Sequence, residues 1–432
     1  MSGRIAIVGG GWAGMAAAVT LAAAGRPVTV FEAATTLGGR ARRVDVHGHA
    51  VDNGQHILLG AYGQTLALLR MVHGDRAERE LLDRRRLHLE QPGVFRFRAP
   101  PLPAPWHLAV ALLTVRGLSR HERLTAVAFV RRLRRGGYRC AGQLTVGALL
   151  ADQPDAAVTH LWEPLCVAAL NTPIDAASAQ IFLNVLRAAF DARARDSDVL
   201  VPRVDLTALF PAAAATYVTA RAGVVRTDHT ISRVAAQEDG VTVASHATEE
   251  RYAAAVIAVS PHQLAHVLPS AESLASALLA QVAAFGYEPI RTTYLQYPRA
   301  LGLPQAMLKL DGDPGQWVFD RGQLGGPLGL AAVVISTDIP AARIEHDVLE
   351  RTLDAQLRRL VPDLPAPAWA QTIAERRATY ACLAGLARPE SGALQPRLYL
   401  AGDYTNAEFP ATLEAATRSG VAAARQLLAA RL

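Results

Sequence analysis

The stretch Arg4-Ile5-Ala6-Ile7-Val8-Gly9-Gly10-Gly11-Trp12-Ala13-Gly14 decides the fold of this chain, and an alanine-rich segment connects it to Val28-Thr29-Val30-Phe31-Glu32. Residues 4–9 form a short apolar run that predicts a strand. Residues 13–24 are helical in composition and end at Gly25, and residues 28–32 are rich in β-branched side chains. The chain is therefore expected to open with a strand, a tight turn, a helix and a second strand.

The turn carries the pattern G-x-G-x-x-G, made by Gly9, Gly11 and Gly14. The first glycine permits the tight turn, the second lets a pyrophosphate approach the backbone, and the third lets helix and strand pack closely. Amides at the helix N-terminus stabilise the phosphate charge. Glu32 can accept hydrogen bonds from ribose hydroxyls, and it would repel a 2′-phosphate. This Rossmann-like unit predicts a bound dinucleotide other than NADP, although a glycine-rich turn without a ligand is the simpler alternative.

The length of 432 residues exceeds what one core usually fills, so two interwoven domains are expected. A mostly polar and helical middle is broken by the Pro100–Pro105 stretch, and alternating strands follow from Gly223. A last strand and helix begin at Leu398. These changes predict an α/β fold with a discontinuous nucleotide domain (residues 1–80, 205–262 and 395–432) and an inserted mixed α+β substrate domain (residues 81–204 and 263–394).

The composition indicates where in the cell the protein works and which partners it does not bind. No charge-free stretch approaches the roughly 20 residues that cross a bilayer, and no basic leader or cleavage site precedes the first strand. A cytoplasmic protein is expected. The 3 cysteines have the spacing of neither a disulfide framework nor a zinc site, so no metal is expected. The pI is about 9.5, but runs such as Arg84–Arg86 and Arg131–Arg135 lack interleaved aromatic residues, so nucleic acid is not expected.

Two further motifs are specific enough to suggest a family. Leu37-Gly38-Gly39-Arg40 follows the opening unit, and Leu398–Asp403 leads into Pro410–Glu414 near the C-terminus. Both resemble the flavin amine oxidase and phytoene desaturase superfamily, which implies FAD. In that superfamily the matching positions contact the pyrophosphate, the ribityl chain, the flavin ring or the adenine, which here implies Gly39, Arg40, Ile231, Gly402, Asp403, Thr412 and Leu413.

The segment Asp52–Tyr62 (DNGQHILLGAY) is the sharpest of the sequence and is similar to the hydroxysqualene dehydroxylases. The family resemblance also includes Leu165–Pro173, which contains Leu170–Pro173, together with Ser197–Arg203 and Arg377–Tyr380. The resemblance therefore covers nearly the full length. It implies reductive removal of the hydroxyl group of hydroxysqualene to give squalene. A carotenoid-type desaturase is the nearest alternative, an amine oxidase is less favoured, and a non-enzymatic prenyl-lipid carrier of the same fold is a third class.

That reaction needs an acid to protonate the leaving hydroxyl group, and His56 and Asp52 are the candidates. Either residue could be structural instead, because Asp52 could cap a helix and a lone histidine is commonly a satisfied core residue. The sequence does not identify the reductant of the flavin.

The segment Trp106–Val115 is apolar, too short to span a bilayer, and followed by Arg116 and Arg120. Such flanks suit a helix that lies in the headgroup layer. This interpretation predicts peripheral contact with the inner face of the membrane. A core helix of the substrate domain is an equally good interpretation of the pattern.

Overall fold

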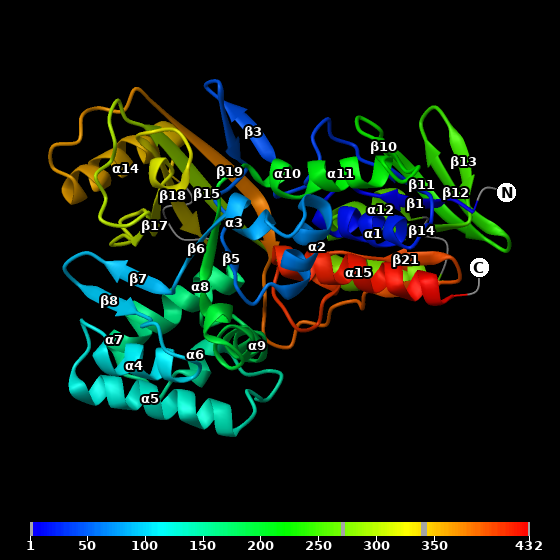
Figure 1. The fold of residues 1–432 in the computed structure, drawn as a ribbon. Coiled ribbons are helices and arrows are strands. Elements are labelled where there is room, and N and C mark those ends of the chain that lie inside the picture. The colour runs from blue at the N-terminus through cyan, green and yellow to red at the C-terminus, as the bar shows by residue number, and fades with distance from the viewer. Residues whose placement is uncertain (1–2, 269–272, 338–343, 431–432) are drawn as a thin grey trace.

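The computed structural model describes residues 3–268, 273–337 and 344–430 (Figure 1). Its first part is built on a six-stranded sheet in the order β10-β2-β1-β14-β21-β20. The strands from β10 to β21 run parallel, and β20 pairs antiparallel at the edge. Their bounds are β1 Ile5–Val8, β2 Val28–Phe31, β10 Val224–Arg226, β14 Ala254–Ile257, β20 Gly392–Gln395 and β21 Leu398–Leu400.

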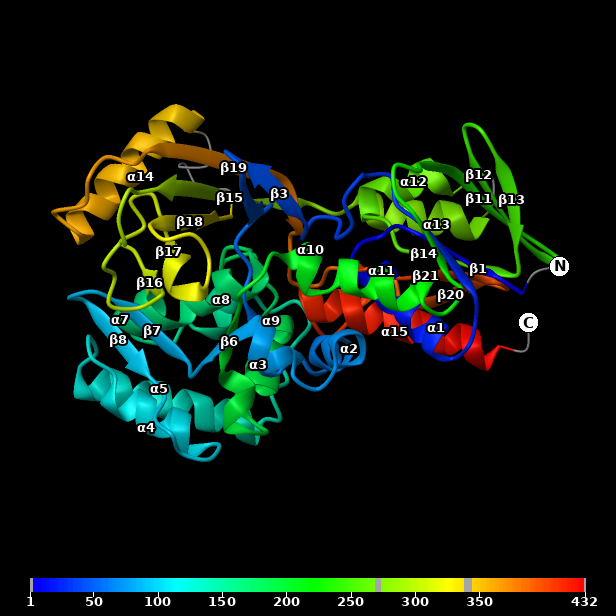
Figure 2. The ribbon, with the colours of Figure 1, turned by 45° about the horizontal axis from the view of Figure 1, so that its top comes forward.

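Helix α1 (Trp12–Ala23) and the C-terminal helix α15 (Leu413–Ala429) lie side by side against this sheet (Figures 1 and 2). Their backbones touch, because a Cβ atom on Gly420 would lie 2.1 Å from the carbonyl oxygen of Ala13. The first and last segments of the chain therefore form one unit. Neighbouring helices are α2 (Gly63–His73), α10 (Leu206–Leu209) and α11 (Pro211–Thr219).

A smaller antiparallel sheet joins this nucleotide-binding part, with strands β11 (Ile231–Gln237), β12 (Gly240–Ser245) and β13 (Glu249–Tyr252). Helix α12 (Leu264–Val267) packs on β11, and α13 (Ser273–Ala283) lies beside α12 (Figure 2).

The second part contains a five-stranded antiparallel sheet in the order β16-β17-β18-β15-β19. Helix α14 (His346–Leu360) packs on one face of it through Leu349, Leu353 and Leu357. The strands are β15 Tyr287–Gln296, β16 Met307–Lys309, β17 Trp317–Asp320, β18 Leu330–Ser336 and β19 Trp369–Tyr380. A helical layer lies below this sheet in Figure 1, with α4 Trp106–Thr114, α5 Arg120–Arg135, α6 Val146–Leu149, α7 Asp155–Ala157, α8 Glu163–Leu170 and α9 Ala179–Phe190.

Short elements complete the described chain. The strands are β3 Arg43–Val46, β4 His49–Asp52, β5 Leu58–Leu59, β6 Leu82–Arg85, β7 His88–Gln91, β8 Phe95–Arg98 and β9 Val199–Pro202. Helix α3 spans Ala77–Leu81, a π-helical turn spans Val158–Trp162, and 3₁₀ turns span Ala194–Ser197, Pro261–Gln263, Gly322–Leu324 and Asp403–Thr405.

The elements expected in the nucleotide-binding part are present within a few residues of their predicted ends. The main sheet takes its strands from three distant parts of the chain, as a discontinuous domain requires, while the exact domain boundaries stay a prediction. The middle differs from expectation because β6, β7, β8 and β9 are strands there. Within the described residues, no helix is both long and apolar enough to cross a membrane.

The arginine runs are largely paired with acids. Arg84 lies 2.9 Å from Glu78 and 3.1 Å from Asp198, and Arg134 lies 2.9 Å from Asp191. Ion pairs of this kind are typical of a salt-bridged protein surface.

Candidate active site

One cavity of about 1020 Å³ runs from the glycine loop after β1 into the second part of the molecule. It lies at the upper end of the range of about 300 to 1,000 Å³ that is common for ligand pockets. Its walls include Gly9, Gly11, Glu32, Gly39, Arg40, His56, Ile231, Gly402, Asp403, Thr412 and Leu413, all predicted as site residues. Two predicted residues, Gly14 and Asp52, lie outside its lining.

The second and third glycines of the motif, Gly11 and Gly14, have different structural roles. A Cβ atom on Gly14 would lie 1.9 Å from the carbonyl oxygen of Gly9, so this position must be glycine for α1 to pack on the loop. A Cβ atom on Gly11 would meet nothing closer than the Cα of Gly39, at 3.9 Å. The protein itself thus leaves room at Gly11, on the cavity side. This is the space that a pyrophosphate needs.

Glu32 supports the same loop. Its Oε2 accepts a hydrogen bond from the Gly10 amide (2.7 Å), and its Oε1 accepts one from the Ala34 amide (2.9 Å). Each carboxylate oxygen has a second lone pair, so Glu32 can still accept a bond from a ribose hydroxyl.

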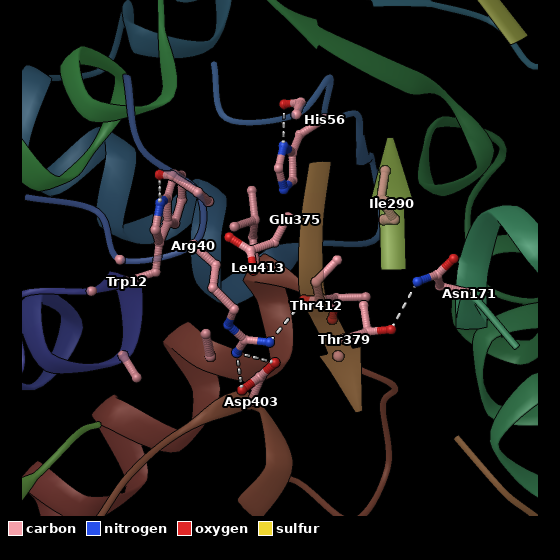
Figure 3. A pocket seen from close by; sticks show the side chains of 18 of the residues that line it. Trp12, Arg40, His56, Asn171, Ile290, Glu375, Thr379, Asp403, Thr412 and Leu413 are labelled. Carbon is pink, nitrogen blue, oxygen red and sulfur yellow. Dashed lines mark hydrogen bonds and ion pairs between the residues drawn. The ribbon is translucent and has the colours of Figure 1, made fainter. Parts of the chain in front are cut away.

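Arg40 is held by the far end of the chain. Its Nη2 lies 2.7 Å from both Oδ1 and Oδ2 of Asp403, and its Nη1 donates to the Ala378 carbonyl (2.8 Å) (Figure 3). Burial alone would lower the pKa of Arg40, but the Asp403 carboxylate raises it, so the guanidinium stays charged. The guanidinium is therefore already paired with Asp403, which leaves only part of its positive charge to offset that of a pyrophosphate.

The C-terminal motif positions the start of α15 at the cavity. The Gly402 amide donates to Ser419 Oγ (2.9 Å), and Thr412 Oγ1 accepts from the Ala415 amide (3.1 Å) as the N-cap of α15. Leu413 begins the helix, whose dipole favours negative charge in front of it. Glu414 points the other way and accepts bonds from amides of α2.

His229 and Ile231 line the end of the cavity near Glu32. The Nε2 atom of His229 is buried and has no hydrogen-bond partner among the described residues. A buried polar atom normally has a partner, and the ribose or base of an adenosine would supply one here. His229 belongs to no motif, so it could not be predicted from the sequence.

The two acid candidates separate in space. Asp52, at the end of β4, accepts a bond from the Leu206 amide (2.7 Å) and is 5% exposed. Burial raises its pKa to about 7. Since Asp52 is absent from the cavity lining, its predicted catalytic role has no geometric support, and its carboxyl group instead fastens the β4 end to α10.

His56 lines the cavity, and its Nδ1 lies 2.7 Å from the Gly54 carbonyl oxygen. A carbonyl can only accept, so Nδ1 carries a hydrogen and Nε2 is left for the cavity. In Figure 3 the His56 ring points into the space beside Glu375. Burial and the nearby Arg40 lower the pKa of His56, although the bond to Gly54 opposes them.

Beyond His56 the cavity becomes apolar. Its wall there comes from α8, α9 and the five-stranded sheet, with Leu165, Phe182, Val185, Leu186, Ile290, Met307, Trp317 and Phe319. These residues are far apart in sequence and belong to no motif, so the sequence could not identify them.

Asn171 and Thr379 mark a polar point on this wall. Asn171 ends α8 in a left-handed conformation (φ 46°), and its Nδ2 donates to Thr379 Oγ1 (2.9 Å) (Figure 3). Its Oδ1 accepts from the Thr337 amide (3.0 Å). The Leu170–Pro173 motif thus joins a helix end to β19.

Comparison with known proteins agrees with this geometry. Residues 12–428 match the family described as flavin containing amine oxidoreductase. A hydroxysqualene dehydroxylase of Rhodopseudomonas palustris is 28% identical, covering 100% of this chain and 99% of that protein. Another, of Sinorhizobium fredii, is 26% identical and covers 98% of each chain.

The solved structure of cyclohexylamine oxidase from Brevibacterium oxydans matches with a TM-score of 0.70 at 17% identity, covering 98% of each chain. This likeness confirms the amine oxidase-like α/β fold that the sequence predicts. The family match spans nearly the whole chain, and the full-length relatives confirm the resemblance to hydroxysqualene dehydroxylases. The protein therefore belongs to the flavin-containing amine oxidoreductases.

Proposed function

We propose that this protein is an FAD-dependent enzyme that removes the hydroxyl group of hydroxysqualene to give squalene. The observation that carries the proposal is that one continuous cavity joins a glycine-lined loop to an apolar chamber. The two full-length relatives are named for this activity, and a C30 hydrocarbon chain suits an apolar chamber.

The residues that would hold FAD come from both ends of the chain and from the segment around β11 in its middle. The adenosine part would meet Glu32, His229 and Ile231, and the pyrophosphate would meet the backbone at Gly11 and Gly39. The N-terminus of α15, with Thr412 and Leu413, would favour negative charge on the ring system. The free space at Gly11 and the unpartnered Nε2 of His229 support this assignment.

The hydroxyl group must gain a proton to leave as water, which is work for a residue of this chain. His56 is the candidate, because its Nε2 faces the cavity while Nδ1 holds the Gly54 carbonyl. The lowered pKa of His56 makes its imidazolium form a better proton donor. When bound and reduced, FAD supplies the hydride that replaces the hydroxyl group.

The apolar wall would hold the carbon chain and keep water from the electron-deficient carbon left when the hydroxyl group departs. A carotenoid-type desaturase could use the same cavity in the opposite direction, taking electrons from its substrate. The direction of electron flow therefore separates the two functions. Reduced enzyme should react with hydroxysqualene under anaerobic conditions, and oxidised enzyme should not react with a polyene.

We also propose that a membrane surface delivers this water-insoluble substrate to a cytoplasmic enzyme. Helix α4 has a buried side and an exposed side. Leu112 is 5% exposed, whereas Trp106 is 63% and Leu113 is 45% exposed. Arg123 of α5 donates to the Leu113 carbonyl (3.4 Å), and Leu124, the next residue of α5, is 60% exposed. We call Trp106, Leu113 and Leu124 the apolar patch.

The apolar patch has basic neighbours, as a headgroup-docking surface should. Arg116, Arg120 and Arg131 are exposed close to it in sequence, on α5 and on the turn before this helix. On the other side of α4, buried His107 bonds to Ser197, which lines the cavity (Nε2 to Oγ, 3.2 Å). Helix α4 thus lies between the surface patch and the cavity wall.

A further inference from the structure

Basic side chains gather at a second place, on the rim of the cavity. His262 follows β14 in a 3₁₀ turn and His266 lies on α12, while Arg376 and Arg377 lie near the end of β19. All of them line the cavity and are exposed to solvent. They therefore mark a place where the cavity opens to the surface, and we call them the basic rim.

The basic rim lacks acidic partners. In contrast to Arg84 and Arg134, none of its side chains forms an ion pair with a described residue. Arg377 is instead 5.7 Å from the ring centroid of Tyr287, and the ring of His262 meets that of Tyr287 edge-on at 6.0 Å. One aromatic ring thus holds two basic groups together.

Two acids lie near the rim. Asp403 is paired with Arg40 at 2.7 Å. Glu375 accepts hydrogen bonds from Asn53 Nδ2 (3.0 Å) and from the Arg377 amide (3.3 Å), and Arg376 and Arg377 together outweigh its single negative charge. The pKa of His262 is lowered by burial and then by Arg377 and Arg40, while the Glu375 carboxylate acts in the opposite direction. Such a rim attracts an anion, and arginine side chains match phosphate oxygens well.

The proposed reaction consumes two electrons in each turnover, so a donor must reach the flavin. Resting on that proposed function, we propose that the basic rim binds the phosphate of a soluble dihydroflavin or dihydronicotinamide nucleotide. The donor gives a hydride to the bound flavin, which also takes a proton, from a dihydroflavin donor or from water. The donor leaves oxidised, and the enzyme is ready for hydroxysqualene.

Shape favours a small donor over a redox protein. The rim consists of side chains that line a concave cavity on two elements, β19 and the β14–α12 connection. A stable protein partner would need about 800 Å² of surface on each side. The phosphates of the enzyme's own FAD have a different place, at the glycine loop.

The test compares two donors with the same redox ring, using FAD-loaded protein without oxygen. Reduced FMN carries a phosphate, and dihydroriboflavin does not. In the variant R376A/R377A, we expect flavin reduction by reduced FMN to slow about tenfold and reduction by dihydroriboflavin to stay unchanged. The control R79A/R425A removes the same net charge from exposed arginines elsewhere and should leave both rates unchanged.

Calorimetric titration of the same proteins with inorganic pyrophosphate gives a readout independent of electron transfer. We expect binding to weaken about tenfold in R376A/R377A and to stay unchanged in the control. An equal loss with both donors, no loss with either, or release of FAD from the rim variant would overturn the proposal. So would rim-dependent reduction by an acidic redox protein alone.

These measurements contain no hydroxysqualene. The basic rim can therefore fail while dehydroxylation is observed, and dehydroxylation can fail while the rim binds its donor.

Discussion

Arg40 Nη2 lies 2.7 Å from both carboxylate oxygens of Asp403, across 363 positions of sequence. This ion pair connects the Gly38–Gly39 loop to the turn that precedes α15. Both partners line the cavity, so the pair joins the two ends of the chain at the place proposed for the flavin.

Removing one partner of this ion pair should lower the affinity for FAD more than removing both. In Arg40→Ala, the Asp403 carboxylate stays in the cavity wall without its counter-charge, so we expect FAD affinity to fall at least about tenfold. The double variant R40A/D403N should recover part of that loss. Fluorescence titration of the apoprotein with FAD measures both effects, and additive losses would show that the pair is not coupled to FAD binding.

Substitution of Gly11 should affect FAD binding, whereas substitution of Gly14 should affect stability. Gly11→Val should fold like the wild type but lose FAD, because its side chain would enter only the free space beside Gly39. Gly14→Ala should unfold at lower temperature, because its Cβ would lie 1.9 Å from the Gly9 carbonyl oxygen. Thermal unfolding of apoproteins, together with flavin content, separates the two; a destabilised Gly11→Val apoprotein would argue against a ligand role for this glycine.

His56→Ala should keep FAD and slow substrate-dependent flavin reoxidation about 100-fold, the usual cost of losing a positioned acid. The acid must be protonated, and the pKa of His56 is lowered below its ordinary value. The wild-type rate should therefore rise as pH falls from 8, by about tenfold per pH unit until the lowered pKa is reached.

Asp52→Asn is the matched variant, because a raised pKa of about 7 for Asp52 would also make the rate fall with rising pH. Its side-chain oxygen can still accept from Leu206, so we expect near-normal turnover with the same pH profile. A profile that becomes flat in Asp52→Asn would assign the proton to Asp52 instead.

Membrane docking should depend on the exposed side of α4 alone. We expect W106D/L113D to keep its flavin and fold but to co-sediment several-fold less with anionic liposomes. Leu112→Asp places a charge in the core at a position only 5% exposed, and it should unfold the helical layer. Unchanged sedimentation of W106D/L113D would show that the apolar patch does not dock on the membrane.

The nucleotide-binding part could be predicted from the sequence because each residue type there has one local reason. Gly14 must be small, residues 5–8 form a buried parallel strand, and Thr412 caps a helix. Local patterns of this kind are legible without knowledge of the tertiary structure.

The rest depends on contacts between distant residues. The partner of Asp52 is an amide at Leu206, and the partner of Arg40 is Asp403. The sequence also left the two sides of α4 undecided, because an apolar helix has the same pattern in a core and at a membrane. The strands β6 to β8 contain charged residues such as Arg84 and Arg96, so their sequence resembles a solvated segment, and β9 is an apolar run of only 4 residues.

The central claim is that electrons flow from the flavin to an isoprenoid alcohol. The most direct test mixes photoreduced, FAD-loaded enzyme with hydroxysqualene in the absence of oxygen and follows the flavin absorbance in a single turnover. We predict that the flavin becomes oxidised and that one squalene forms for each flavin. Flavin that stays reduced with hydroxysqualene unchanged, or oxidised enzyme that instead introduces double bonds into a polyene, would contradict the proposed function.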